Sequence, residues 1–267
     1  MTTRVQSIID ELEALVPAHL AEEWDNVGLQ VGHPGWPVDK VLVALDPSMA
    51  VVEEAVREGA TAVVTHHPLI FRPLRGLNLA SATGRLLQRL VNARVAVLTA
   101  HTNLDSVSGG INDALVELLA LQSATVLQPL AGDRNAGLGR VGTLPQPVAF
   151  ESLVRDIKAR LGLVHLRYAG RPEDPVRRVA VCSGSGGSLI EPFLNSSAEV
   201  YVTGDVRYHD AREIEAHRRG VVDIGHFESE HLIVRRLAGL LGDRLAKRGI
   251  EVVVQAATCE ETPFITL

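Results

Sequence analysis

Two adjacent histidines, His66 and His67, follow the apolar run 62–64 and Thr65 and precede Pro68. A short apolar run of this kind is typical of a buried strand. In open α/β sheets the chemistry takes place beyond the carboxyl ends of the strands. Histidine is also the commonest metal ligand among the side chains. The pair therefore predicts a metal site at one edge of a sheet.

Two further histidines repeat this arrangement. His101 and His226 each follow an apolar run, and a carboxylate comes four residues later in each case, Asp105 and Glu230. Together with the histidine pair, the sequence offers four imidazoles and two carboxylates, enough for two metal ions. Because two divalent ions carry four positive charges, a shared carboxylate is economical, and Glu230 is the predicted bridge. His101 is interpreted as a residue that holds another ligand in place, with direct ligation as the alternative.

Each of these residues also has a structural explanation. A histidine at a strand end could simply form a hydrogen bond, and Asp105 could be a turn residue. Glu230 could lie in the first turn of a helix, where a carboxylate is favoured by the helix dipole. The other six histidines lack strand-end partners and are interpreted as structural or surface residues, with His209 the nearest to an exception because acids flank it: His19, His33, His165, His209, His217 and His231.

Composition limits the class of protein. The chain has 267 residues, of which 46% are hydrophobic and 22% are charged, with a formal net charge of −6. This acidic balance argues against a nucleic-acid or anionic-membrane surface, and no segment is apolar enough for a membrane helix or signal peptide. A cytoplasmic protein with small-molecule or protein partners is expected. The two cysteines, Cys182 and Cys259, form no metal or disulfide motif, so any metal has nitrogen and oxygen ligands, which suits zinc, iron, manganese or cobalt.

The predicted elements alternate between strands and helices. Such alternation predicts βαβ units, a mostly parallel sheet and an α/β fold. A change to Gly, Asp, Asn and Pro between Gln128 and Gly142 predicts a linker, which gives a first domain over 1–128 and a second over 129–267, whose C-terminal segment could pack onto the first. Strands are predicted at 40–45, 61–65, 95–100, 176–182, 199–203, 221–225 and 251–254, and helices at 7–15, 49–58, 83–93, 111–121, 150–161, 189–194, 208–219 and 230–248.

The two halves resemble each other in order. When the two halves are aligned, residues 179–182 correspond to residues 41–44, and His226 and Glu230 correspond to His101 and Asp105. The pattern predicts an internal duplication, with two similar α/β domains and a metal site in the cleft between them.

Two glycine-containing stretches stay open in meaning. The stretch 23–32, which contains Trp24, is either a turn into a short strand with a half-buried tryptophan or a loop that contributes to a site. The loop from Ser183 to Ser188 could cradle a phosphate at a helix start or be a plain tight turn.

Several stretches are similar in sequence to signatures of the Nif-three-like family, often labelled GTP cyclohydrolase I type 2. They are Trp24-Asp25-Asn26-Val27-Gly28-Leu29, His66-His67-Pro68, His101-Thr102-Asn103-Leu104-Asp105, Thr203-Gly204-Asp205 and Gly225-His226-Phe227-Glu228-Ser229-Glu230. This resemblance implies two similar α/β domains, a dinuclear divalent metal centre and a toroidal hexamer. It also implies the metal ligands His66, His67, Asp105, His226 and Glu230, with Glu230 reaching both ions.

A dinuclear centre favours metal-dependent hydrolysis, and the family label suggests GTP or a related nucleotide as substrate. No residue of the sequence indicates a guanine pocket, so the substrate-binding residues stay undefined. The alternative is a hexameric metal-binding or protein-interaction scaffold without turnover. A third reading, nucleotide binding through the loop from Ser183 to Ser188, would not depend on metal.

Overall fold

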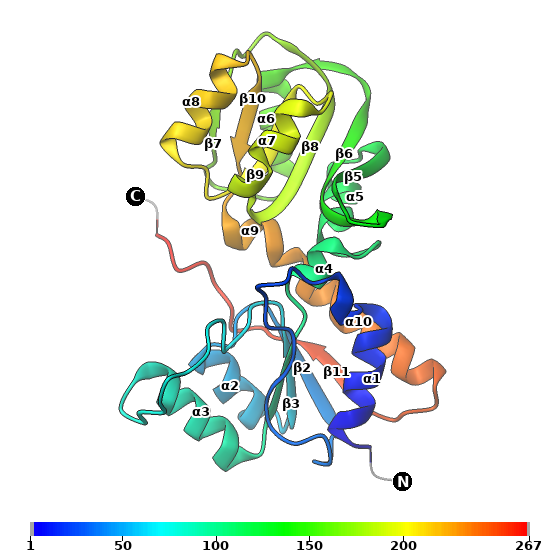
Figure 1. Ribbon diagram of the computed structural model, residues 1–267, viewed down its shortest axis with the longest axis vertical. Coiled ribbons are helices and arrows are strands. Elements are labelled where there is room, and N and C mark those ends of the chain that lie inside the picture. Colours follow the sequence, from blue (N-terminus) through cyan, green and yellow to red (C-terminus); the bar gives the residue numbers. More distant parts are fainter. Residues whose placement is uncertain (1–2, 266–267) are drawn as a thin grey trace. The chain divides into compact units, whose positions relative to one another are not determined.

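The computed structural model describes residues 3–265, which form two compact units, each built on its own β-sheet (Figure 1). Unit 1 contains residues up to Leu104 together with 233–265, and unit 2 contains Asp105–Leu232. The chain thus leaves unit 1 within helix α4 (Thr102–Ser106) and returns to it at the start of helix α10 (Leu232–Lys247). The sequence pattern predicts a single domain boundary between residues 128 and 129, with a C-terminal segment that could pack onto the first domain.

Unit 1 is a five-stranded sheet with helices on both faces. The strand order is β1-β4-β3-β2-β11, in which β4, β3, β2 and β11 are parallel and β1 is antiparallel to β4. Its elements besides α4 and α10 are α1 (Val5–Leu15), a 3-10 turn (Ala18–Leu20), β1 (Gly28–Val31), β2 (Lys40–Ala44), α2 (Met49–Arg57), β3 (Ala62–Thr65), α3 (Ala82–Ala93), β4 (Ala96–Thr99) and β11 (Val253–Ala256).

The parallel strands of unit 1 are buried on both faces. Leu42 and Val63 pack with the apolar sides of α2 and α3 in one core cluster. The alternate residues Val41, Val43 and Val64 are fully buried on the opposite face. Figure 1 shows α2 and α3 on one side of this sheet and α1 and α10 on the other. Continuous apolar runs are what such a doubly covered parallel sheet requires.

Unit 2 is a six-stranded mixed sheet in the order β5-β6-β8-β9-β10-β7. Strands β8, β9 and β10 are parallel, while β5, β6 and β7 pair antiparallel with their neighbours. Its elements are α5 (Ile111–Leu118), β5 (Gln122–Leu130), β6 (Asp133–Ala149), α6 (Phe150–Arg160), β7 (Arg167–Ala169), β8 (Pro175–Ser185), a 3-10 turn (Gly186–Leu189), α7 (Ile190–Asn195), β9 (Val200–Gly204), α8 (Tyr208–Ala216), β10 (Gly220–Asp223) and α9 (His226–Glu230).

Alternate residues of the central strand of unit 2 face two different cores. Val200 and Val202 pack with α5 and α6, whereas Tyr201 packs with α7 and α8, where its ring stacks on Phe193 at a centroid distance of 5.1 Å. Both faces are therefore covered, as in unit 1. The mixed α/β class predicted from the alternating pattern is confirmed for the described residues.

Two predicted boundaries are corrected by the structure. The stretch from Gln128 to Gly142 is not a linker: it belongs to the β5–β6 hairpin, in which Gln128 pairs with Leu138. Its glycines and polar residues are compatible with an exposed edge hairpin, so the composition suggested a loop. The long helix predicted over 230–248 is found as α10, which begins at Leu232, and the predicted first residue Glu230 is instead the last residue of the short helix α9.

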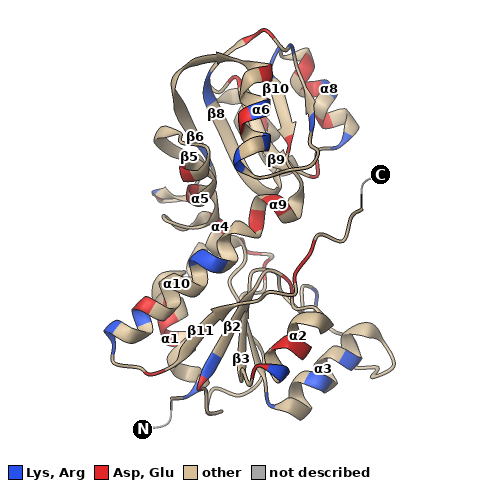
Figure 2. Cartoon of the chain, turned by 180° about the vertical axis from the view of Figure 1, so that it is seen from behind, with Lys and Arg blue, Asp and Glu red and all other residues tan. Residues whose placement is uncertain are grey.

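Helices α8 and α10 carry charges of both signs, as Figure 2 shows, whereas the charges of α3 are all basic. In the part of the chain that the structure describes, no helix is both long enough and apolar enough to cross a bilayer.

Candidate metal centre

Three imidazole rings gather at the carboxyl ends of the parallel strands in unit 1. His66 and His67 follow β3, and His101 follows the neighbouring strand β4. The ring centroid of His66 lies 5.0 Å from the ring centroid of His67 and 5.1 Å from that of His101. Each ring offers one nitrogen, and the three nitrogens lie within 4.8 Å of one another. These three residues, the histidine cluster, could hold a metal ion.

Each ring of the histidine cluster is fixed through its Nδ1 atom. His66 Nδ1 lies 3.0 Å from the backbone oxygen of Ala100, and His67 Nδ1 lies 2.8 Å from Asp46 Oδ1. His101 Nδ1 lies 2.8 Å from Asp25 Oδ1. An acceptor at Nδ1 places the proton there and leaves Nε2 as the ligand atom, which is the usual outer-shell arrangement of metal-binding histidines.

Asp25 connects the Trp-Asp-Asn stretch to the histidine cluster. It precedes β1, and because β1 runs antiparallel to β4, its start lies at the same sheet edge as His101. Its carboxylate also accepts hydrogen bonds from the backbone N–H and the hydroxyl of Thr102 at the start of α4. Burial raises the pKa of Asp25, but these bonds and His101 outweigh it and lower the pKa to about 2. Asp25 is therefore a fixed anion that orients His101.

A second group, the carboxylate cluster, lies in unit 2 and consists of Asp105, His226 and Glu230. His226 and Glu230 begin and end the short helix α9, and His226 Nε2 lies 3.1 Å from Glu230 Oε2. Oxygen atoms of Asp105 and Glu230 lie within 4.8 Å of one another. Asp105 also accepts a hydrogen bond of 2.9 Å from the Ser183 hydroxyl. Two carboxylates and an imidazole thus share one small volume.

His226 follows the orientation rule of the other three histidines. Its Nδ1 lies 2.7 Å from Asp205 Oδ2, at the end of the neighbouring strand β9. The hydrogen bond to Glu230 is the largest influence that raises the pKa of His226 to about 9, with Asp205 adding to it and burial opposing it. Without a metal ion this imidazole is therefore protonated at neutral pH. A metal bound at Nε2 would have to displace that proton.

The end of β8 packs closely against the carboxylate cluster. Gly184 has φ +59°, and a Cβ at this position would lie 2.1 Å from Glu230 Oε1 and 3.3 Å from His226 Nε2. The N–H of Gly184 donates to the Ser229 hydroxyl at 2.8 Å, and the N–H of Ser183 donates to Asn112 Oδ1 at 2.9 Å. Two donors that a phosphate cradle would need at the start of the loop are thus already engaged within the protein. Gly184 provides close approach for the Glu230 carboxylate.

The two clusters together fit divalent transition metals. Four imidazoles with engaged Nδ1 atoms offer Nε2 nitrogens, and two carboxylates offer oxygens. Nitrogen and oxygen donors in this combination suit zinc, iron, manganese or cobalt.

Comparison with known protein families gives one match that spans nearly the whole chain. The family described as Duf34/NIF3 (NGG1p interacting factor 3) matches residues 3–263. The chain belongs to the NIF3 family. A relative from Clostridium perfringens, named GTP cyclohydrolase 1 type 2 homolog, is 33% identical over 98% of this chain and all of its own length. A relative of the same name from Lactococcus lactis is 36% identical over 98% of each chain.

Solved structures of NIF3-related proteins share this fold. A Bacillus cereus protein related to NIF3 matches with a TM-score of 0.94 and 26% identity, covering 100% of this chain and 99% of its own. Reduced HcgD from Methanocaldococcus jannaschii matches with a TM-score of 0.81 and 30% identity, covering 96% and 98%.

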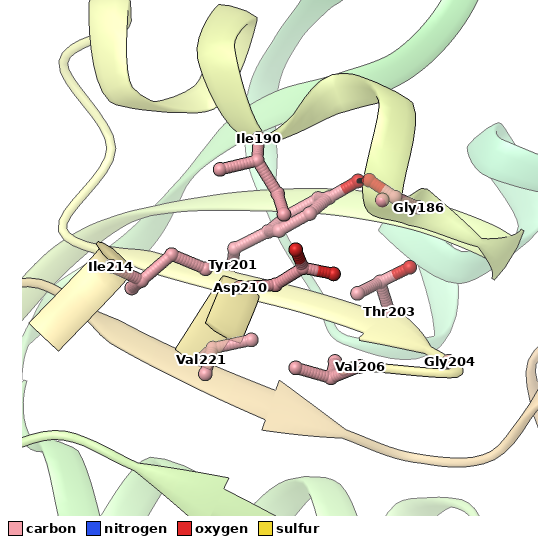
Figure 3. Close-up of a pocket in the computed structure, with 10 residues that line it drawn as sticks. Gly186, Ile190, Tyr201, Thr203, Gly204, Val206, Asp210, Ile214 and Val221 are labelled. Atoms are coloured by element: carbon pink, nitrogen blue, oxygen red, sulfur yellow. Dashed lines mark hydrogen bonds between the residues drawn. The ribbon is translucent and has the colours of Figure 1, made fainter. Parts of the chain in front are cut away.

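A small cavity in unit 2 of this NIF3 chain is lined by residues outside the carboxylate cluster. It has a volume of about 10 Å³, room for about one water molecule. Figure 3 shows three of the side chains that line it, Tyr201 and Thr203 of β9 and Asp210 of α8. The Tyr201 hydroxyl donates to the Gly186 oxygen at 2.9 Å. The cavity is too small for a metabolite and contains none of the six clustered residues.

Sequence reasoning found the clustered residues of this NIF3 chain but not the carboxylates behind them. The structure brings His101 into the histidine cluster with the same kind of Nδ1 partner as His67. The missed residues are Asp25, Asp46 and Asp205. Asp46 and Asp205 each follow a buried strand, which was the available signal, while Asp25 stands in the stretch that was left open between a turn and a site loop. Trp24 in that stretch is 58% exposed rather than half-buried.

Proposed function

We propose that this protein binds two divalent metal ions through His66, His67, Asp105, His226 and Glu230 and uses them for hydrolysis. Binding both ions at one centre would require the histidine cluster of unit 1 and the carboxylate cluster of unit 2 to open onto a common cleft, and this cleft is part of the proposal. Glu230 would serve both ions, as the resemblance implies, and its two carboxylate oxygens make such a shared role possible.

One observation carries this proposal: each clustered histidine has an acceptor at Nδ1. For three of them the acceptor is a carboxylate, Asp46, Asp25 or Asp205. Carboxylate partners increase the basicity of the imidazole and fix its direction, which is what a metal ligand needs. Histidines with a purely structural role would not all be expected to have an acceptor at Nδ1.

Bound metal ions would supply Lewis acidity and lower the pKa of a bound water toward neutrality. The residues of this chain would offset the charge of the ions and orient their ligands. Asp105 and Glu230 offset positive charge, while Asp46 and Asp205 hold the rings of His67 and His226 in direction. His101, held by Asp25 with its Nε2 among the other ring nitrogens, serves as a further ligand or as a group that holds a proton near the substrate.

GTP or a related nucleotide is the proposed substrate class. The support for this comes from the relatives, which are named GTP cyclohydrolase 1 type 2 homolog.

Elemental analysis and a hydrolysis screen test the proposal together. Purified protein should contain close to two equivalents of divalent metal, and metal-loaded protein should hydrolyse at least one member of a panel of nucleotides and phosphoesters. His67→Ala and Glu230→Ala should lose both metal and activity. The control is His217→Ala, because His217 is exposed and its Nδ1 lies 2.9 Å from the carbonyl of Glu213 in its own helix. Activity that survives both ligand substitutions would refute the hydrolase; bound metal without turnover would favour the scaffold.

A homo-oligomer, specifically a hexamer, is the proposed assembly. The resemblance to the Nif-three-like family supports it. Native mass spectrometry should then give roughly 170 kDa, six times the 28.7 kDa chain. A monomer mass at micromolar concentration would contradict it.

An internal duplication is proposed as the origin of the two units. The element order α1-β1-β2-α2-β3-α3-β4-α4-α5 recurs as α6-β7-β8-α7-β9-α8-β10-α9-α10. The strand orders β1-β4-β3-β2 and β7-β10-β9-β8 also correspond, each with an antiparallel first strand. On this alignment α4, which carries Asp105, corresponds to α9, which carries Glu230. A profile comparison of many homologues should recover the same offset; an unrelated offset would contradict the duplication.

A further inference from the structure

The C-terminal segment of unit 1 runs along the strand that leads toward the histidine cluster. Strand β11 pairs in parallel with β2, with Val254 opposite Val41 and Ala256 opposite Val43. The pairing continues through Ala257, whose N–H donates to the carbonyl of Val43 at 2.7 Å. The following residues, 258–260, therefore lie beside the carboxyl end of β2.

Two carboxylates fasten this segment from opposite sides. Glu54 of α2 is buried and accepts the N–H groups of Thr258 and Cys259 at 3.0 Å each, together with the Thr258 hydroxyl at 2.7 Å. Glu260 reaches in the other direction and accepts the N–H groups of Leu45 and Asp46. Figure 2 shows the acidic stretch that contains Glu260 between β11 and the C-terminus.

Glu260 binds the two N–H groups that follow β2. Both of its oxygens lie 2.9 Å from the nitrogen of Leu45, and Oε1 lies 2.8 Å from the nitrogen of Asp46. Hydrogen bonds to a carboxylate are roughly twice as strong as those between neutral groups. The carboxylate of Glu260 therefore sets the position of this dipeptide.

The same dipeptide holds His67 in two ways. The carbonyl of Leu45 accepts the backbone N–H of His67 at 2.9 Å, and the side chain of Asp46 lies 2.8 Å from Nδ1 of its ring. The N–H of Asp46 and the carbonyl of Leu45 belong to one peptide group. A single peptide group thus joins the carboxylate of Glu260 to the backbone of His67.

The side chain of Asp46 is only loosely packed. Its side chain is 50% exposed, so packing does not determine where its carboxylate points. Its position depends on its own backbone, and that backbone is held by Glu260.

We propose that Glu260 is a positioning residue of the metal centre, which acts through the Leu45–Asp46 peptide and the Asp46 carboxylate to direct His67 Nε2 toward a bound ion. This inference rests on the proposed function, since it takes His67 as a ligand. It makes the C-terminal segment part of the metal site even though that segment contributes no ligand. Because coupling between sites is reciprocal, metal bound at His67 should in turn hold the segment in place.

Metal affinity is the direct test. The variants are Glu260→Ala and Glu260→Gln in the full-length chain, and the matched control is Glu261→Ala, an exposed carboxylate one residue further on. Zn²⁺ affinity is measured by competition with a chromogenic chelator, and bound Zn²⁺ is counted by elemental analysis. We expect Glu260→Ala to bind Zn²⁺ about tenfold more weakly, the lower end of the range for groups that orient a ligand. Glu260→Gln, which keeps one acceptor oxygen, should fall between Ala and wild type, and it also serves if the alanine variant does not fold.

A double-mutant cycle separates positioning from general support of the fold. Asp46→Ala removes the carboxylate that orients the His67 ring but keeps the Leu45 carbonyl that binds the His67 backbone, so Glu260→Ala should weaken Zn²⁺ binding clearly less in the Asp46→Ala background than in wild type. A purely structural role would give the same fold-change in both backgrounds. Hydrogen exchange on the wild-type protein adds a readout without mutation: Zn²⁺ should slow exchange in the peptide that covers 257–262.

The outcomes are distinct. Weaker binding in Glu260→Ala that becomes clearly smaller in the Asp46→Ala background supports the proposal. Unchanged affinity in Glu260→Ala, or equal losses in both backgrounds, overturns it while leaving a wild-type protein that binds two ions as proposed. Wild-type protein that binds no Zn²⁺ overturns the proposed function and this inference with it.

Discussion

Replacing Gly184 by Ala should disable the carboxylate cluster while leaving the fold intact. Gly184 lies at the end of β8 with φ +59°, and the added Cβ would lie 2.1 Å from Glu230 Oε1. An ordinary contact begins at 3.4 Å, so the carboxylate oxygen would have to move by about 1.3 Å. Metal–ligand distances tolerate only about 0.2 Å.

The expected magnitude follows from these two effects. An alanine in the left-handed region costs about 1 kcal/mol of unfolding free energy, which a stable domain survives. Displacing Glu230 should reduce Zn²⁺ affinity by about 100-fold, the upper end for changes that misplace a ligand. Competition with a chromogenic chelator measures the affinity, and urea unfolding measures the stability.

Gly187→Ala is the matched control in the same loop. A Cβ there would meet its nearest atom, Asp210 Oδ2, at 3.7 Å, and Gly187 has no positive φ. This variant should bind Zn²⁺ as wild type does. If Gly184→Ala also keeps wild-type affinity and metal count, then Glu230 does not bind metal from a position in contact with Gly184.

Three further predictions concern buried and titrating groups. Asp25→Asn should lower the unfolding free energy of the metal-free protein by about 2 kcal/mol at pH 7, because the pKa of Asp25 falls from 3.8 to about 2 on folding. Since that pKa is lowered, the contribution is present above pH 4 and lost as the pH falls toward 2, so urea titrations of the two proteins should converge there. Glu54→Ala should cost about 3 kcal/mol of unfolding free energy, since the partly buried N–H groups of Thr258 and Cys259 and the Thr258 hydroxyl lose their charged acceptor. Glu53→Ala, which loses only a surface ion pair with Arg89, should cost under about 1 kcal/mol in the same denaturant assay. Burial raises the pKa of both Cys182 and Cys259 to about 12, so native protein should react with iodoacetamide at pH 8 about a thousandfold more slowly than unfolded protein; rapid labelling of Cys182 would contradict its burial.

The sequence located the clustered histidines because their signal is local. An apolar run followed by His66 or His226 identifies a strand and its end within a few residues. The carboxylate that accompanies His101 or His226 could be found for the same reason, since Asp105 and Glu230 each lie four residues after their histidine.

The orienting carboxylates could not be found in this way because they are distant in sequence. Asp25 meets His101 across 76 positions and Asp46 meets His67 across 21. These contacts depend on the order of strands in the sheet, which no local pattern encodes. The hairpin around Gln128 was missed for a related reason: its polar residues suit an exposed edge strand as well as a loop, and only the pairing partner distinguishes the two.

The position of β11 has a consequence for biosynthesis. This strand pairs with β2 across more than two hundred residues of intervening chain, and all of unit 2 is translated between the two. A ribosome therefore delivers every strand of unit 2 before the last strand of unit 1 exists, so unit 2 can fold first, as domains commonly do during synthesis. Until residue 256 has emerged, β2 is an unpaired edge, the kind of strand that recruits other chains. Nascent chains that stall before this point should be the ones that depend on chaperones.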